Sequence, residues 1–369
     1  MAAEPNAAPL PRVCIVGPLP PPSGGMANQC EQLARLLAAD GIAVEVVRNN
    51  APYRPAWIGS LPVLRAGFRL VPYLRRLWTA AGRADVMHVL ANSGWAWHLF
   101  AAPAVWVGRV RRTPVIINYR GGNADTFFSA APGIVQRTLR MASLRVTPSG
   151  YLLRVFKKHA LDACVVPNII DLSRFSACPP RDFKDAPHLI VTRNLEDIYD
   201  IPTALKAFAM IRIRFPRARL TVAGSGPARP QLLALAHELK VDAAVDFCGR
   251  IDNAKIPALY SSADCMLNPT TVDNMPISIL EAFASGVPVI STNAGGIPDI
   301  ATDGVSARLV PIGDANALAA SAIEVLESHM ACAHMVAAGR QEAECYSWTK
   351  VGPQWHSIYQ DLMRRKTRT

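Results

Sequence analysis

Two carboxylates on either side of a predicted helix start form the most informative pattern in the chain. Asp273 and Glu281 stand eight positions apart. The helix is predicted to begin between them, over Met275, Pro276, Ile277 and Ser278. Proline suits the first helical position, because its missing N–H would be unpaired there in any case. The free amides and the positive end of such a helix bind anions, so a phosphate held between two carboxylates predicts a sugar-diphosphate pocket.

The residues after Glu281 define the end of this helix and carry a family resemblance. Gly286 and Pro288 are predicted to end the helix, and a strand is predicted over Val287–Ile290. The stretch resembles the retaining nucleotide-sugar glycosyltransferases of family 4, in which two acids with seven residues between them precede Ala-Met-Ala-x-Gly-x-Pro-Val. The matching positions are Glu281, Ala282, Ala284, Gly286, Pro288 and Val289. The family usually has Glu and Gly at two positions that are Asp273 and Pro276 here.

The resemblance implies a GT-B fold and a role for each matched residue. Glu281 is expected to bind the nucleotide ribose and Asp273 the donor-sugar hydroxyls, while Gly25, Arg193 and the amides near Ile277 hold the diphosphate. Transfer is expected to proceed by front-face attack assisted by the leaving phosphate, with retention and without a protein nucleophile. No metal or other cofactor is implied, because cationic side chains and a helix end take the place of Mg²⁺. The predicted catalytic residues are Asp273, Glu281, Arg120 and Arg193.

A glycine pair joins the first predicted strand to the first predicted helix. Gly24 and Gly25 lie between Ser23 and Met26, and glycine there lets backbone amides approach a diphosphate closely. Any strand-to-helix turn also favours glycine. Beside the Glu281 segment the pair favours a phosphate contact, since family members place such a loop next to the donor phosphates. Its spacing does not match the GxGxxG dinucleotide fingerprint, which argues against a dehydrogenase.

Two arginines follow predicted strands at the edge where α/β sheets bind ligands. Arg193 stands where the family has Arg, but the Lys that the family has five positions later is Ile198 here. Arg193 is expected to bind the diphosphate through a bidentate fork, or else to be a surface residue. Arg120 stands where many relatives have His. A guanidinium is no general base near neutral pH, so Arg120 is expected to stabilise charge on the leaving phosphate, or else to form a structural salt bridge.

Further loop residues are predicted at the same edges. Gly224 lies in a segment, 223–227, that resembles the family's Gly-x-Gly-Pro element. Arg250 and Ile251 follow the next predicted strand, where their backbone groups are expected to read a uracil. Asn118 and Asn123 on either side of Arg120 are weaker candidates for hydroxyl contacts.

Short apolar runs alternate with helical patterns along the chain, which indicates parallel sheets with crossover helices. The predicted strands are Val13–Val16, Val44–Val47, Val86–Val89, Val115–Asn118, Leu144–Thr147, Leu189–Val191, Leu220–Ala223, Val245–Phe247, Cys265–Leu267 and Val287–Ile290. Two doubly wound, Rossmann-like α/β domains facing a central cleft are the economical interpretation.

The predicted domains are an acceptor-binding domain at 1–175 and a nucleotide-sugar-binding domain at 176–345, with a linker at 176–187. An amphipathic helix is predicted over Tyr346–Met363. The resemblance implies that this C-terminal segment, 346–369, crosses back to pack on the N-terminal domain.

The positive charge is concentrated in the first half of the chain. Residues 1–180 contain 20 Lys and Arg against 8 Asp and Glu, a net of +12, whereas residues 181–369 have a net of −1. Between Ile58 and Trp78 apolar residues recur at three- and four-residue steps. The basic residues among them are Arg65, Arg69, Arg75 and Arg76. Such a segment either lies on an anionic membrane surface or forms two ordinary helices broken near Pro62 and Pro72.

Other classes of protein are disfavoured by what the sequence lacks. No nucleic-acid recognition motif accompanies the basic half. The eight cysteines are dispersed, without CxxC or zinc-ligand spacing, which predicts reduced thiols in a cytosolic protein and no metal site. The N-terminus does not read as a signal peptide, and the most apolar region, Trp95–Val110, is too short to span a bilayer. We therefore expect a cytoplasmic protein, with peripheral contact to the inner membrane face as an open alternative.

The favoured function is transfer of a sugar from a nucleoside-diphosphate sugar, expected to be a UDP-sugar, to an acceptor hydroxyl in polysaccharide or glycolipid assembly. The partners are then the donor, a glycan or lipid-linked acceptor and, for the membrane alternative, an anionic surface. A nucleotide-sugar epimerase or a sugar phosphorylase has the same architecture and stays an alternative. So does a catalytically weak scaffold that binds sugar nucleotides, because Ile198 and Arg120 replace the usual Lys and His.

Overall fold

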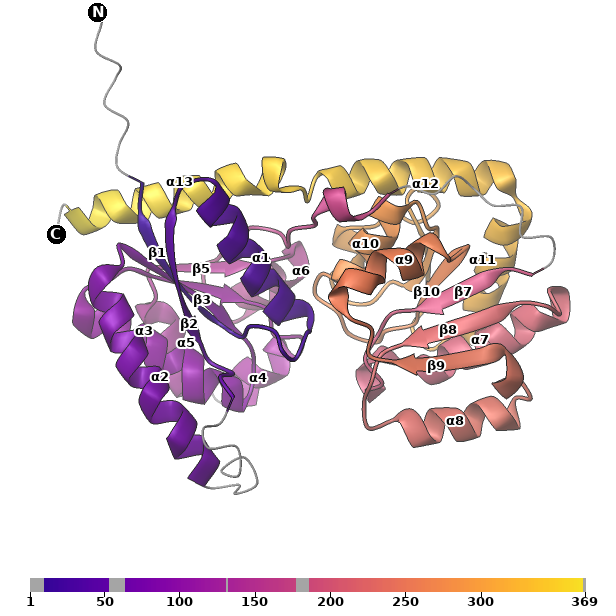
Figure 1. The fold of residues 1–369 in the computed structure, drawn as a ribbon, viewed down its shortest axis with the longest axis horizontal. Coiled ribbons are helices and arrows are strands. Elements are labelled where there is room, and N and C mark those ends of the chain that lie inside the picture. The colour runs from indigo at the N-terminus through magenta and orange to yellow at the C-terminus, as the bar shows by residue number, and fades with distance from the viewer. Residues whose placement is uncertain (1–9, 53–63, 131, 177–185, 368–369) are drawn as a thin grey trace, which may run out of the picture. The chain divides into compact units, whose positions relative to one another are not determined.

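The computed structural model describes residues 10–52, 64–130, 132–176 and 186–367, which form two compact units. The first unit contains the chain up to Ile169 together with the part from Val351 onward, and the second unit is Ile170–Lys350 (Figure 1). The chain thus changes unit a few residues before the predicted boundary at 175 and returns a few residues after 346. The predicted linker, 176–187, lies almost wholly outside the described residues, as does the amphipathic segment before Leu64.

The first unit is built on a parallel six-stranded sheet with the strand order β2-β1-β3-β4-β5-β6. Its strands are β1 (Arg12–Gly17), β2 (Ala43–Arg48), β3 (Val86–Ala91), β4 (Val115–Tyr119), β5 (Leu144–Thr147) and β6 (Cys164–Val165). Its helices are α1 (Gly25–Ala39), α2 (Leu64–Arg83), α3 (Ala102–Arg111), α4 (Ala124–Ala130), α5 (Pro132–Met141), α6 (Gly150–Lys158) and most of α13 (Trp348–Thr367). The order reverses between β1 and β3, so the loops after these two strands flank the switch point where such sheets bind ligands.

The C-terminal helix α13 packs into the first unit through aromatic side chains. Trp355 and Tyr359 are fully buried, and Trp355 lies against the ring of His88 on β3, with 4.5 Å between the ring centroids. Figure 1 shows α1 and α13 on one side of the sheet and α2, α3 and α5 on the other. Burial on both faces explains why β3 and β4 read as continuous apolar runs instead of alternating patterns.

Helix α2 runs through Pro72 without a break, so the predicted interruption there is wrong. A proline costs a helix one hydrogen bond, but packing of the apolar face compensates for it. Tyr73, Leu77 and Ala80 are buried, and the Tyr73 hydroxyl donates a hydrogen bond to the Phe100 carbonyl at 2.7 Å.

The second unit repeats the architecture, with the strand order β12-β11-β10-β7-β8-β9. Its strands are β7 (His188–Val191), β8 (Arg219–Ala223), β9 (Val245–Gly249), β10 (Cys265–Asn268), β11 (Val289–Thr292) and β12 (Arg308–Val310). Its helices are α7 (Ile201–Arg214), α8 (Arg229–Glu238), α9 (Ile256–Ser261), α10 (Ile277–Ser285), α11 (Ala315–Glu327) and α12 (His329–Glu344). Here the order reverses between β7 and β10, which makes the loops after these strands the second switch point.

The predicted strands are all present, and β11 begins at Val289, two residues later than the sequence pattern indicates. Two edge strands of only two and three residues, β6 and β12, are not predicted from the sequence. All cysteines in the described part of the chain are free thiols, as predicted. Among the described helices, none combines the length and the apolar character that crossing a membrane requires.

Candidate functional site

Three polar side chains converge at the switch point of the second sheet. Arg193 follows β7, Asn268 ends β10 and Asp273 lies in the loop after β10. The Arg193 Nε donates a hydrogen bond to Asn268 Oδ1 at 2.7 Å, and an Nη of Arg193 lies 2.8 Å from Asp273 Oδ2. The side chains of Arg193 and Asp273 are only 10% and 14% exposed. Both predicted residues therefore belong to one ion pair at a ligand-binding edge, held by an asparagine that the sequence analysis did not identify.

The Arg193 guanidinium is also fixed from its other side. Its central carbon lies 5.2 Å from the centre of the Tyr199 ring, a cation–π contact. Asn268 is held in turn, because its Nδ2 donates to Ser291 Oγ on β11 at 2.8 Å. The surface alternative for Arg193 is thus wrong for this structure. A guanidinium with its planar face and two of its edges engaged is held in one orientation.

A glycine sets the backbone of Asp273. The Gly296 N–H donates to the Asp273 carbonyl at 2.8 Å, and Gly295 has a φ of +56°. A Cβ on Gly295 would lie 2.1 Å from the Asp273 carbonyl oxygen. The Gly295-Gly296 turn after β11 therefore positions Asp273 and accepts no larger side chain without moving it.

Glu281 on α10 belongs to a buried network centred on the Tyr260 hydroxyl. This hydroxyl lies 3.2 Å from Glu281 Oε2, 2.9 Å from the Ser278 carbonyl oxygen and 2.9 Å from Thr192 Oγ1. Burial raises the pKa of Glu281 from 4.5 to about 7, although Tyr260, Arg174 and Arg193 act in the opposite direction. Burial also raises the pKa of Tyr260 well above its ordinary value, so its hydroxyl stays a donor. Glu281 therefore changes charge close to neutral pH.

Helix α10 starts within the predicted segment, but Pro276 is the residue before the helix and not its first residue. The helix begins at Ile277, and Pro276 is the capping residue with an extended backbone, φ −69° and ψ 115°. Its carbonyl accepts the first-turn hydrogen bond from the Ile279 N–H at 3.2 Å. No side chain caps α10, and the buried Ser278 Oγ lacks a hydrogen-bond partner within the described residues. The helix ends at Gly286 in the left-handed conformation, as predicted. Met275 is buried beside this start.

The other predicted residues of the second unit have different surroundings. Gly224 packs against the Arg193 loop, since a Cβ there would lie 1.9 Å from the Arg193 carbonyl oxygen. This contact within the protein explains why position 224 needs glycine. Arg250 and Ile251 follow β9, which is the edge strand and is separated from β7 by β8. They lie at the same end of the sheet as Arg193, but two strands away.

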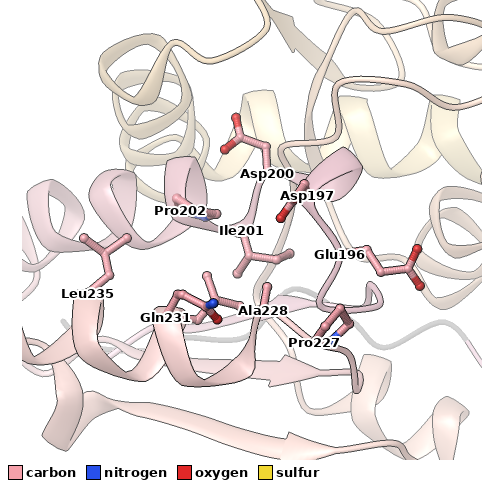
Figure 2. Close-up of a pocket in the computed structure, with 10 residues that line it drawn as sticks. Glu196, Asp197, Asp200, Ile201, Pro202, Pro227, Ala228, Gln231 and Leu235 are labelled. Carbon is pink, nitrogen blue, oxygen red and sulfur yellow. The ribbon is translucent and has the colours of Figure 1, made fainter.

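A pocket of about 550 Å³ lies beside the Arg193 loop (Figure 2). It has an apolar floor of Ile201, Leu232 and Leu235, and three carboxylates at its border, those of Glu196, Asp197 and Asp200. Figure 2 shows these carboxylates pointing in different directions. In the described part of the chain, no three His, Cys, Asp or Glu side chains gather where they could hold a metal ion.

In the first unit, Gly24 and Gly25 form the exposed start of α1. Gly24 has an extended backbone, no side chain caps the helix, and a Cβ on either glycine would meet no atom within 4 Å. Neither φ is positive. The protein itself therefore does not require glycine at these two positions, in contrast to Gly224. Gly24 is also the capping residue of α1, a position that favours glycine, and the phosphate contact of the pair stays a prediction.

Arg120 is the outermost of a series of hydrogen-bonded polar side chains in the first unit. Its guanidinium donates hydrogen bonds to Asn118 Oδ1 at 3.3 Å and Asn168 Oδ1 at 2.5 Å. The residue keeps some exposed surface, yet burial of the guanidinium lowers its pKa from 12.5 to about 10. It therefore stays charged at neutral pH. Asn118 is fully buried, so its predicted hydroxyl contact is wrong, whereas Asn123 is exposed.

The hydrogen bond from Arg120 to Asn118 determines the direction of the next two hydrogen bonds, the one between Asn118 and His88 and the one between His88 and Tyr359. Because Arg120 donates to Asn118 Oδ1, the Asn118 Nδ2 must donate to His88 Nε2, 3.0 Å away. His88 Nδ1 then carries the proton and donates to the Tyr359 hydroxyl on α13 at 2.7 Å. Burial and the nearby Arg120 lower the pKa of His88 to about 3, so the imidazole is neutral. Nothing in the sequence pattern signals these partners, since they meet only after the strands pair.

Comparison with known proteins covers both units. The family model described as Glycosyltransferase Family 4 matches residues 23–174, and the one described as Glycosyl transferases group 1 matches residues 180–342. The phosphatidyl-myo-inositol mannosyltransferase of Mycolicibacterium smegmatis is 26% identical over 365 residues, covering 92% of this chain and 90% of that protein. The N-acetyl-alpha-D-glucosaminyl L-malate synthase of Bacillus anthracis is 30% identical over 177 residues, covering 48% of this chain and 46% of that protein.

Two solved structures have the same fold. HepE of Anabaena in complex with UDP superposes with a TM-score of 0.72 at 17% identity, and the match covers 95% of this chain and 100% of HepE. The sucrose-phosphate synthase of Thermosynechococcus elongatus has a TM-score of 0.74 at 19% identity, with 96% and 100% coverage. At such identities the likeness concerns the fold.

Proposed function

The chain belongs to the family 4-like glycosyltransferases of the GT-B fold, and we propose that it transfers a hexose from a UDP-sugar to an acceptor hydroxyl with retention of configuration. The observation that carries this proposal is the Arg193–Asp273 pair at the switch point of the second sheet, beside Glu281 and the open start of α10. A cation and free amides suit a diphosphate, and two carboxylates suit sugar and ribose hydroxyls.

The donor assignment draws support from relatives as well as from chemistry. HepE was solved with UDP and with UDP-glucose, and the mycobacterial relative is named for transfer of mannose to a phosphatidyl-inositol. We propose that Glu281 accepts ribose hydrogen bonds, Asp273 accepts those of the sugar, and Arg193 with Gly24 and Gly25 contacts the diphosphate. Arg250 and Ile251 contact the base through their backbone.

In the proposed reaction, the bond between the sugar C1 and the phosphate oxygen breaks as the acceptor oxygen bonds to C1 from the same face. The acceptor proton passes to the leaving phosphate oxygen, so no protein base is needed. Arg120 stabilises the charge that develops on that phosphate, because it is held in one orientation and keeps its positive charge. Arginines and the helix start provide the positive charge that a metal ion would otherwise supply, so we expect activity to survive chelation by EDTA.

For the acceptor, we propose a glycan or lipid-linked molecule at an anionic membrane face. Helix α2 exposes Phe68, Val71 and Trp78 to 55%, 53% and 46%, and its neighbour α3 exposes Trp106 and Val110 to 45% and 64%. Arginines lie among these apolar side chains, and the Arg111 guanidinium carbon lies 4.9 Å from the centre of the Trp78 ring. Apolar and cationic groups on one surface suit peripheral binding to anionic lipid.

One experiment tests the transfer directly. The purified chain is incubated with UDP-glucose, UDP-galactose, UDP-N-acetylglucosamine or GDP-mannose, with and without a mixture of bacterial lipid acceptors, and released nucleoside diphosphate is measured. We expect release that depends on the acceptor and falls strongly in Asp273→Ala. Binding of a donor without turnover, unaffected by Asp273→Ala, would identify a scaffold instead. Conversion of the donor to an isomer without release would identify an epimerase.

A further inference from the structure

The loop after β3 presents an exposed tryptophan at the switch point of the first sheet. β3 ends at Ala91, and the loop continues through Asn92, Ser93 and Gly94 to Trp95. β1 and β3 are the two neighbours at which the strand order reverses, and a doubly wound sheet binds its ligands outside the carboxyl ends of such strands. The loop after β3 therefore borders a ligand-binding position, and none of the roles proposed above uses it.

This loop is fixed to the strand that carries Arg120. The Arg120 N–H donates to the Ala91 carbonyl at 2.8 Å, and Ser93 Oγ lies 2.7 Å from the Tyr119 hydroxyl. Gly121 fits tightly against the loop, since a Cβ there would lie 2.3 Å from Ser93 Oγ. These contacts place the loop directly beside Arg120 at the sheet edge.

The exposure of Trp95 is built into the backbone. Gly94 has a φ of +70°, its carbonyl accepts the Trp97 N–H at 3.0 Å, and Trp97 is buried. Trp95 itself is 79% exposed, against 46% for Trp78 and 45% for Trp106. An indole turned outward at a rigid position leaves a large apolar surface in water, which is the state of a binding platform without its ligand.

Polar and aromatic neighbours surround the indole. The Trp95 and His98 ring centroids lie 6.2 Å apart with edge-to-face geometry, and His98 lies 5.9 Å from the Phe127 ring. Asn92 and His98 are exposed; Asn92 Oδ1 accepts from the Ser93 N–H at 2.8 Å, which leaves its Nδ2 and the His98 ring nitrogens to face a ligand. A sugar or cyclitol ring has matching chemistry, because one face presents C–H groups and the rim presents hydroxyls. A hydrocarbon chain fits less well, since it offers nothing to the polar neighbours.

We infer that Trp95, with Asn92 and His98, is a subsite that stacks a polyhydroxylated six-membered ring of the acceptor. The inference rests on the proposed function and deepens it by naming the chemistry of the acceptor. The acceptor ring lies on the indole in the first unit, next to the arginine proposed to act on the leaving group. The exposed surface of α2 and α3 is left for the lipid-facing contact.

Binding to the full chain tests the subsite without relying on turnover. Saturation-transfer NMR is recorded with methyl α-D-mannopyranoside, methyl β-D-glucopyranoside, methyl β-D-galactopyranoside and myo-inositol, with decyl phosphate as the alkyl probe. We expect at least one ring probe to bind, and Trp95→Ala to lose about tenfold in its affinity, with partial recovery in Trp95→Phe. Ile134→Ala on α5 is the matched control, because this side chain of the same unit is 65% exposed and has no proposed role, and it should bind as the wild type does.

The outcomes separate this inference from the proposed function. Loss of ring binding in Trp95→Ala with unchanged UDP affinity supports the subsite even where no transfer is found. Unchanged ring binding in Trp95→Ala, equal loss in Ile134→Ala, or binding of decyl phosphate alone would overturn it. So would a wild-type chain that binds none of the ring probes. Where turnover is measurable, Trp95→Ala should raise the KM for the acceptor about tenfold and leave the KM for the donor unchanged.

Discussion

The two units hold their arginines in different ways at equivalent edges of their sheets. In the second unit, Arg193 is paired with the carboxylate of Asp273 and lies against Tyr199. In the first unit, Arg120 donates to the side-chain oxygens of two asparagines. Amide oxygens orient a guanidinium without neutralising it, whereas a carboxylate does both. The carboxylate pairing in the second unit agrees with the proposal that Arg193 and Asp273 hold a diphosphate and a sugar together. The amide pairing in the first unit agrees with the proposal that Arg120 keeps its charge for the leaving phosphate.

Removal of Arg193 should have the largest effect. In Arg193→Ala the diphosphate loses its fixed cation and Asp273 loses its partner, so we expect kcat/KM to fall about 100- to 1,000-fold in the nucleoside-diphosphate release assay. Arg214→Ala is the control in the same unit, because Arg214 forms an exposed ion pair with Glu327 and such pairs contribute little. Retained activity in Arg193→Ala, or equal losses in the two variants, would refute the difference drawn between the units.

The glycines give a second test of the same contrast. Gly224→Ala places a Cβ against the Arg193 carbonyl oxygen, so we expect the free energy of unfolding to fall by about 3 kcal/mol in urea titrations. Gly24→Ala enters open space and should leave stability within about 0.5 kcal/mol of the wild type. It should still weaken UDP binding, measured by calorimetry, because the methyl group stands where the diphosphate is proposed to approach. Unchanged UDP affinity in Gly24→Ala would remove the ligand-based reason for this glycine.

The pH dependence of stability tests the network around Glu281. Its pKa is raised to about 7 in the folded protein from an ordinary 4.5, so between these values the folded state keeps a proton that the unfolded chain has lost. The free energy of unfolding contributed by this group is therefore full below pH 4.5 and falls as pH rises toward 7. Glu281→Gln cannot ionise, so from pH 4.5 to pH 8 the variant should gain about 3 kcal/mol relative to the wild type. Parallel stability curves for the two proteins would show that folding does not raise the pKa of Glu281.

The smallest expected effect concerns the hydrogen bonds that join Asn118, His88 and Tyr359 in the first unit. Tyr359→Phe leaves the buried His88 Nδ1–H without its acceptor, which should lower the free energy of unfolding by about 1 kcal/mol in urea. Tyr346→Phe is the comparison, because its hydroxyl donates to Glu342 in a partly buried place where water can substitute. If Tyr359→Phe is no less stable than Tyr346→Phe, the His88 Nδ1–H does not depend on the Tyr359 hydroxyl as its acceptor.

The sequence identified most of the fold and the charged part of the site, for physical reasons. Buried parallel strands read as continuous apolar runs, and polar residues after their carboxyl ends indicate a switch point, so the positions of Arg193 and Asp273 at one edge could be predicted without coordinates. Asn268 carried a usable signal as well, since it is a polar residue at the end of β10.

Other features depend on contacts that no local pattern records. The Tyr260 hydroxyl meets Glu281 and Thr192 only because α9 packs beside α10 and β7, and His88 meets Tyr359 across more than half of the chain. Asn118 has a side chain of the type that contacts ligands, yet it is buried within the sheet. Helix α2 continues through Pro72 because tertiary packing outweighs the local cost of proline.

His88 also gives the molecule an internal spectroscopic reporter. Its ring is neutral above a pKa of about 3 and is held in the Nδ1–H tautomer by Asn118, whose orientation depends on Arg120. The ¹⁵N chemical shifts of its two ring nitrogens should therefore be those of one tautomer across the physiological pH range. A ligand that draws the guanidinium away from Asn118 releases the amide to rotate, and the two shifts should then move toward each other. Engagement of Arg120 at the sheet edge can thus be observed from beneath α13, without a label on any residue that touches the ligand.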